Sequence, residues 1–192
     1  MSIFEKYILI ITIVGFVMYL INMLMYKFSD SLNVDPLLTI IAIVGGSGGI
    51  LLAILLFDRK SVKDNMMSRV FVICVFIIQV VIVLFLSGAH GEKITFSFWE
   101  FFAEHKILIA YLVIINFVSF AAFAIDKINA IEKRSRIRIV TLLGLAFVGG
   151  SLGAILGMYL LRHKTRIDYF TVGVPLIMFM QVVVVFYLMN MK

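Results

Sequence analysis

Four consecutive residues, Arg162, His163, Lys164 and Thr165, form the run in this sequence that is best suited to binding an anion. An arginine can bind phosphate through two parallel hydrogen bonds, and a lysine adds a compact positive charge. Cations at the C-terminal end of a helix also interact favourably with the helix dipole. The alternative is an interfacial anchor, in which long basic side chains reach toward lipid phosphates. Imidazole groups change charge near neutral pH, but only Asp168 lies near His163 in the sequence, which indicates neither a metal site nor a general base.

Asp126 and Lys127 are a second candidate, because they close another long apolar stretch. The simpler interpretation is a locally neutralised ion pair, and the sharper one is that Asp126 binds an ion or a proton within the membrane. The sequence contains no HExxH, P-loop or CxxC motif and no recognisable nucleophile–base pair. An enzyme is therefore the minority interpretation, and we expect no cofactor and no metal.

The composition that surrounds these residues is that of an integral membrane protein. Of the 192 residues, 63% are hydrophobic and 15% are charged, and the mean hydropathy is +1.13. Soluble domains are only about 45–50% apolar. The first apolar run lacks an Ala-x-Ala cleavage pattern, which favours a retained membrane helix over a signal peptide. The single Cys74 excludes a disulfide framework and a cysteine metal site. We attribute the net charge of +6 to membrane orientation and anionic lipid, and not to nucleic acid.

Cutting the chain at its polar clusters predicts an all-α protein with six transmembrane helices of roughly 20 residues each. The predicted spans are residues 7–26, 37–57, 70–86, 107–125, 139–161 and 169–189. Residues 88–106 join the third span to the fourth and are rich in charged and aromatic side chains. We expect this connector to lie at the membrane interface.

The two halves of the sequence match without a gap when Gly45 is aligned with Gly149, an offset of 104 residues. The segment VGGSGG, residues 44–49, then faces VGGSLG, residues 148–153, and Lys60 faces Lys164. We expect two repeats, over residues 7–87 and 107–192. Because three spans are an odd number, the second repeat would enter the membrane from the opposite side, which predicts an inverted repeat of the kind found in transporters.

Small residues recur every four positions in the second and fifth predicted spans, and so lie on one face of each helix. Such stripes let helix backbones approach closely in lipid. The alternative is that Gly-Gly-Ser loosens the helix and exposes carbonyls to an ion or substrate. Asn116 and Gln181 are expected to form hydrogen bonds between helices. The residues assigned to helix packing are Gly45, Gly46, Ser47 and Gly49, and Gly149, Gly150, Ser151, Gly153 and Gly157.

The orientation follows from the Lys and Arg residues on each side of six straight spans. Eleven of the 17 would lie with the two termini and six on the opposite side. Cytoplasmic loops carry the excess of positive charge. This predicts a multi-pass protein of the cell (plasma) membrane with both termini in the cytoplasm.

The second half resembles the small membrane family called domain of unknown function 1294. The resemblance lies in Asp126-Lys127, Arg136-Ile137, the Gly149-Gly150-Ser151 block with Gly153 and Gly157-Met158, and Arg162-His163-Lys164-Thr165. It covers about residues 107–190. Phe123 stands where the family has a tyrosine, and Arg138-Ile139 replaces its Pro-Glu. The first half is similar to a diverged second copy, with Asn22-Met23 at the Asp-Lys position. The resemblance implies no activity.

Inversion would make the candidate sites composite. One membrane face would gather Asp126 and Lys127 with Arg59 and Lys60, and the other would gather Asn22 with Arg162, His163 and Lys164. We expect a small transporter or channel-like protein for an anionic or phosphate-bearing solute or lipid headgroup. The alternative is a non-catalytic structural or regulatory membrane protein that binds anionic lipid or a protein partner. The sequence leaves a homo-oligomer open.

Overall fold

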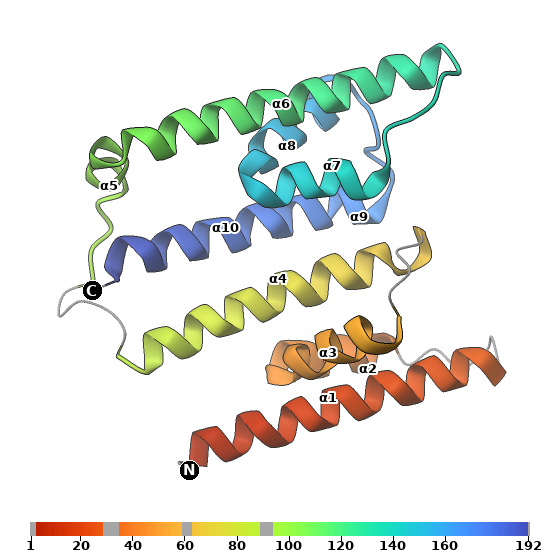
Figure 1. Ribbon diagram of the computed structural model, residues 1–192, viewed down its shortest axis with the longest axis vertical. Coiled ribbons are helices and arrows are strands. Elements are labelled where there is room, and N and C mark those ends of the chain that lie inside the picture. Colours follow the sequence, from red (N-terminus) through yellow and green to blue (C-terminus); the bar gives the residue numbers. More distant parts are fainter. Residues whose placement is uncertain (1–2, 29–34, 59–62, 89–93, 192) are drawn as a thin grey trace. The chain divides into compact units, whose positions relative to one another are not determined.

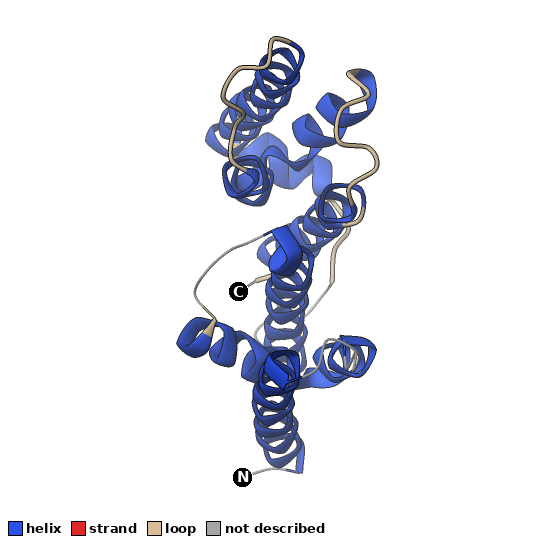
Figure 2. Ribbon diagram, turned by 90° about the vertical axis from the view of Figure 1, so that its right-hand side faces the viewer, coloured by secondary structure: helices blue, strands red, loops and turns tan. Residues whose placement is uncertain are grey.

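The computed structural model describes residues 3–28, 35–58, 63–88 and 94–191, and within these ranges every regular element is a helix (Figures 1 and 2). Six helical segments among the described residues are long and apolar enough to cross a membrane. They are Ile3–Met25, Pro36–Phe57, Met66–Leu86, Lys106–Ile131, Ile139–Leu160 and Asp168–Asn190. These findings confirm the predicted all-α membrane protein. The chain divides into two compact units, Met1–Val80 and Val81–Lys192.

The first unit contains a long helix, a broken segment and most of a second long helix. α1 (Ile3–Phe28) is followed by α2 (Asp35–Ile41), the turn η1 (Ala42–Gly46) and α3 (Ser47–Phe57), and then by α4 (Lys63–Leu86). Gly45 breaks the segment with a φ of 131°, a left-handed conformation that glycine adopts without a Cβ clash. A Cβ built on Gly45 would lie 3.1 Å from Ile11, and Tyr19 bonds Asp58 at the far end of α3. α3 therefore runs alongside α1 in the same direction.

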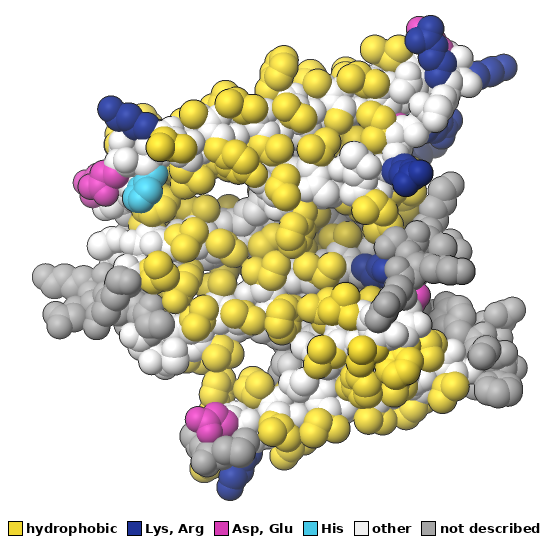
Figure 3. All heavy atoms as spheres, in the orientation of Figure 1, with side chains coloured by type: hydrophobic (Ala, Val, Ile, Leu, Met, Phe, Trp, Pro, Cys, Tyr) yellow, Lys and Arg dark blue, Asp and Glu magenta, His cyan; other side chains and the backbone are white. Residues whose placement is uncertain are grey.

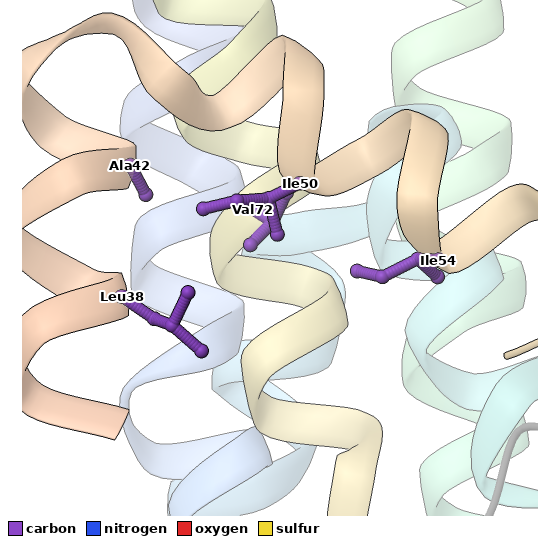
Figure 4. Close-up of a cluster of buried hydrophobic side chains, with 5 residues drawn as sticks. All are labelled: Leu38, Ala42, Ile50, Ile54 and Val72. Carbon is purple, nitrogen blue, oxygen red and sulfur yellow. The ribbon is translucent and has the colours of Figure 1, made fainter. Parts of the chain in front are cut away.

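The two arms of this segment meet in a small core (Figure 4). Leu38 and Ala42 from the first arm pack with Ile50 and Ile54 from α3 and with Val72 from α4. Since α2 and α3 share this core on either side of the turn, the segment is a hairpin and not one straight helix.

The second unit repeats this plan, and its elements are drawn in green to blue in Figure 1. The end of α4 leads through the short helix α5 (Phe98–Glu104) into the long helix α6 (Lys106–Ile131). Then come α7 (Ile139–Leu145), the turn η2 (Ala146–Gly150) and α8 (Ser151–Leu160). The short α9 (Asp168–Thr171) and the long α10 (Gly173–Asn190) complete the unit.

The segment from α7 to α8 also doubles back. Gly149 has a φ of 120° inside η2, and α7 and α8 pack against each other and against α6. Ile137, before α7, and His163, after α8, both bond the carboxylate of Asp126. The same 26 residues in one straight α-helix would place them about 39 Å apart, at 1.5 Å per residue. We call α2–η1–α3 the first hairpin and α7–η2–α8 the second hairpin, with an apex at the glycine turn and a mouth at the opposite end.

This reversal differs from the expectation that the second and fifth spans run straight across the membrane. The two segments are apolar and long enough to do so, but each returns to the end where it began. The inverted repeat was derived from an odd number of crossings in each half of the chain. A segment that returns to its own end does not add a crossing, so this geometry does not give that odd number.

The outer surfaces of the long helices are strongly apolar, as the hydrophobic side chains in Figure 3 show. On α6, for example, Val113, Ile114 and Phe117 are all exposed by more than 60%. Such a surface is unusual for a soluble protein. In a membrane protein, lipid chains are expected to cover this apolar surface.

Candidate functional site

The centre of the site is Asp126 on α6, a carboxylate that is completely buried. Its Oδ1 accepts a hydrogen bond of 2.9 Å from the backbone N–H of Ile137, at the start of the second hairpin. Its Oδ2 lies 2.8 Å from Nε2 of His163 and 2.8 Å from Nζ of Lys164, both at the end of that hairpin. One side chain therefore holds the two ends of the hairpin together, and we call Asp126, His163 and Lys164 the clasp.

The backbone after α8 turns His163 and Lys164 toward Asp126. The N–H of Arg162 bonds the carbonyl of Tyr159 and the N–H of His163 bonds that of Met158, the pattern of a Schellman helix end. Arg162 and Lys164 have φ values of 48° and 61°, which non-glycine residues rarely adopt. In this turn His163 and Lys164 point inward, with side chains 15% and 11% exposed, whereas Arg162 is exposed.

Two further contacts complete the clasp. Nζ of Lys127 donates a 2.7 Å hydrogen bond to the carbonyl of Leu161, one of the carbonyls left without an intrahelical partner at the end of α8. The ring of Phe170 lies 4.7 Å from Nζ of Lys164 and packs edge-on against Phe123. The ammonium group therefore lies between a carboxylate and an aromatic face, both of which attract a cation.

This geometry changes the assignments made from the sequence. Asp126 and the Arg162–Lys164 run were expected on opposite membrane faces, but they are in contact. Asp126 pairs with Lys164 and His163, and not with its neighbour Lys127. Thr165 is half-buried after the clasp. Asn22 is buried on α1, in the first unit. Arg59 and Lys60, the predicted partners of Asp126 and Lys127, lie outside the described residues.

The apex of the second hairpin is held by side chains that reach its backbone. Tyr111 donates a 2.5 Å hydrogen bond to the carbonyl of Val148, and Asn116 donates one of 2.9 Å to that of Gly149. Gln181 donates to the carbonyls of Ala146 and Phe147 at 2.8 and 2.9 Å, and accepts from the hydroxyl of Ser151. The bonds from Asn116 and Gln181 between helices confirm their predicted role. Four carbonyls of the turn, those of residues 146–149, therefore have side-chain partners in this conformation, which favours a turn held by the protein over ion coordination.

The apex of the first hairpin has corresponding contacts. Tyr7 bonds the carbonyl of Val44 at 2.7 Å, and Gln79 bonds those of Ala42 and Ile43 at 2.6 and 2.9 Å. The Ser47 hydroxyl also bonds Gln79. Tyr7, Val44, Ala42 and Ser47 match Tyr111, Val148, Ala146 and Ser151 at the offset of 104 residues, whereas Gln79 and Gln181 are 102 apart. The contacts that hold an apex are thus present in both units.

The mouths of the two hairpins differ. In the first unit Asp58, directly after α3, forms an ion pair of 3.1 Å with Arg69 on α4 and accepts a hydrogen bond from Tyr19 on α1. The acidic group there lies on the hairpin, whereas in the second unit it lies on the long helix α6. Asn22 occupies the position that Asp126 has in the second unit.

The glycines along α3 and α8 lie where the neighbouring helix leaves no room for a side chain. A Cβ on Gly153 would lie 1.9 Å from the carbonyl oxygen of Asn116, and one on Gly49 would lie 1.8 Å from that of Thr12. A Cβ on Gly157 would lie 2.8 Å from the Cβ of Phe123. The α6–α8 seam between apex and mouth is therefore filled by close backbone contact.

Several residues that matter to this site were not found from the sequence. Tyr7 and Tyr111 match each other at the repeat offset, which is a signal that could have identified them. Phe170 and the Asp58–Arg69 pair carry no such signal, because their roles depend on the hairpin turning back.

One comparison with known proteins covers the same region. A family described as "Protein of unknown function (DUF1294)" matches residues 116–170, from the asparagine at the apex to the aromatic ring beneath Lys164. The uncharacterized protein YsdA of Bacillus subtilis (strain 168) is 40% identical over 79 residues, which are 41% of this chain and 89% of that protein. No solved structure matches the chain.

Proposed function

Because the chain belongs to the DUF1294 family of proteins of unknown function, we propose a role for it from geometry: a small transporter or channel-like membrane protein. Its cargo would be an anionic or phosphate-bearing solute or lipid headgroup. YsdA aligns over nearly its whole length to less than half of this chain, which supports the single hairpin unit as the functional module.

The observation that carries this proposal is the apolar hairpin with a chain reversal at its apex. Irregular backbone at membrane depth is tolerated only where protein covers it or where it lines a water-filled cavity. Here Tyr111, Asn116 and Gln181 are devoted to the turn carbonyls. Interrupted helices of this kind place a helix N-terminus inside the membrane in transporters, where its positive dipole end favours anionic groups. α8 begins directly after the apex, which supports an anionic cargo.

We further propose that each unit crosses the membrane twice and that both hairpins open toward the cytoplasm. If the hairpins return, the chain ends and the connector share one side and both mouths share the other. Only four of the 17 Lys and Arg residues then lie with the chain ends and connector: Lys6, Lys93, Lys106 and Lys192. Thirteen against four is a stronger asymmetry than the eleven against six of straight spans. It favours cytoplasmic mouths and external termini, in place of the cytoplasmic termini expected from six straight spans. It also removes the difficulty of a basic run on the external side.

Anion flux through the purified chain in liposomes tests the transport proposal. Inorganic phosphate is the soluble probe, and a fluorescent phosphatidylglycerol tests movement of a headgroup between leaflets. We expect one of them to move faster than in protein-free vesicles, and Asp126→Asn to abolish the difference. Gly144→Ala is the matched control, since a Cβ there has no atom within 4 Å. Equal rates with and without protein, for both probes, would refute transport of these cargoes.

A structural or regulatory protein that binds anionic lipid or a protein partner is the second candidate. It is favoured by one observation: Lys127, His163 and Lys164 are engaged in contacts within the unit. If this is their whole role, Asp126→Asn will destabilise the protein, and neither the wild type nor the variant will show flux.

A further inference from the structure

The exposed cations at the mouth of the second hairpin are different residues from those of the clasp. His163 and Lys164 are turned inward to Asp126, and Lys127 caps α8. Six other basic residues of the mouth have exposed side chains, and one of them, Arg134, is paired with Glu132. The remaining five are Lys133, Arg136, Arg138, Arg162 and Arg166. We call these five the basic collar. They come from the α6–α7 connection and from the chain after α8, which the clasp brings to one end of the unit.

The acidic groups near the collar do not balance its charge. Asp126 is buried and paired, and Glu132 forms an ion pair of 2.9 Å with Arg134, which is not a collar residue. Among the described acidic residues of the mouth this leaves Asp168 against the five cations. The collar is therefore strongly positive, and the ligand that fits it is anionic.

Exposed apolar side chains lie directly beside the collar in sequence, at the ends of α6 and α8. Tyr159 and Leu160 precede Arg162 and are 56% and 70% exposed, and Ile131 precedes Lys133 and is 69% exposed. Figure 3 shows Lys and Arg side chains next to hydrophobic surface where α6 ends. A soluble phosphate needs only the cations, whereas a phospholipid places its headgroup against cations and its chains against apolar surface.

We propose that the basic collar binds the headgroups of anionic phospholipids in the leaflet that the hairpin mouth faces. The inference depends on the clasp geometry and on the membrane location of α6 and α8, and not on the transport of any solute. It moves the anion-binding role within the Arg162–Thr165 run from His163 and Lys164 to Arg162, and adds Arg166, Lys133, Arg136 and Arg138.

Native mass spectrometry of the purified chain in detergent tests the proposal directly. Phosphatidylglycerol and phosphatidylcholine with identical chains are titrated against the wild type and against R162Q/R166Q. The matched control is K6Q/K106Q, which removes two exposed charges that are not at a hairpin mouth. One lies near the start of α1 and the other at the start of α6. Each cation near a membrane surface contributes about 1 kcal/mol to the attraction of anionic lipid, so losing two should weaken phosphatidylglycerol binding about tenfold or more. R162K/R166K, which keeps both charges, should bind within about threefold of the wild type.

Three results would overturn the proposal. Phosphatidylcholine could bind as well as phosphatidylglycerol, or K6Q/K106Q could lose as much affinity as R162Q/R166Q. Inorganic phosphate at the concentration of the lipid could displace phosphatidylglycerol, which would identify the collar as a site for a soluble anion. The proposal of transport stands or falls on the flux assay independently of these outcomes.

Discussion

The clasp predicts strong energetic coupling between Asp126 and Lys164. Asp126→Asn keeps the shape of the side chain but removes the negative charge beside an ammonium group that is 11% exposed. Breaking one partner out of a buried ion pair typically costs about 3–5 kcal/mol, because the other charge stays buried without compensation. Lys164→Met leaves Asp126 bonded to His163 and to the N–H of Ile137. Its expected cost is about 2 kcal/mol, the range of one charged hydrogen bond.

The double variant separates a clasp from two unrelated contacts. With neither charge present no buried charge is left alone, so we expect D126N/K164M to cost about 3 kcal/mol. Independent effects would add to about 6 kcal/mol. The difference between about 6 and about 3 kcal/mol is a coupling energy of roughly 2–3 kcal/mol. This lies near the upper end of the coupling energies measured for residues in contact. Glu132 and Arg134 provide the control, since this exposed pair is expected to couple by about 0.5 kcal/mol or less.

The assay needs a reporter close to the hairpin. Ser119 on α6 is fully buried, and its Cβ would lie 2.7 Å from a Cβ on Gly150 at the apex. In a Cys74→Ala background, Ser119→Cys supplies a single thiol whose reaction with a maleimide measures the free energy of local opening. Additive effects of D126N and K164M on this opening free energy would refute the clasp.

Three further predictions test the hairpin itself, each by substitution and unfolding in detergent. Gly153→Ala should destabilise by about 3 kcal/mol, because its Cβ would lie 1.9 Å from a backbone oxygen, whereas Gly144→Ala should change stability by less than about 1 kcal/mol; equal effects would contradict the close seam. Asn116→Leu should cost at least about 2 kcal/mol, since it leaves the carbonyl of Gly149 and the N–H of Gly153 without a partner, and a neutral result would show that the apex is not held this way. Arg162→Gly should be neutral or stabilise by up to about 1 kcal/mol at its φ of 48°, while Arg162→Val should destabilise, and the reverse order would disprove the left-handed turn.

The sequence was sufficient for those features that depend on composition and local pattern. Long apolar runs predicted six helical segments, and the offset that pairs Gly45 with Gly149 aligned the two glycine blocks, which were not predicted to be turns but in which the structure places both apices. The sequence also identified Asn116 and Gln181 as residues that form hydrogen bonds between helices, because side-chain amides in apolar runs need partners.

The hairpins could not be predicted in the same way. A segment of 22 apolar residues such as Ile139–Leu160 has the length of a straight span, and its glycines read equally well as a packing stripe. The deciding property is the φ of Gly149, which depends on tertiary contacts from Tyr111, Asn116 and Gln181. Once that segment was taken as straight, Asp126 and Lys164 had to be placed at opposite faces. The clasp was therefore missed, although its members were all among the candidate residues.

Labelling of single cysteines in sealed membrane vesicles tests the returning hairpin most directly. In the Cys74→Ala background, Ser135→Cys lies before α7, Arg166→Cys lies after α8, and Glu100→Cys lies on α5 before α6. A membrane-impermeant maleimide should label residues 135 and 166 from the same side and residue 100 from the other. Labelling of residues 135 and 166 from opposite sides would mean that the segment crosses the membrane, and the clasp could not exist.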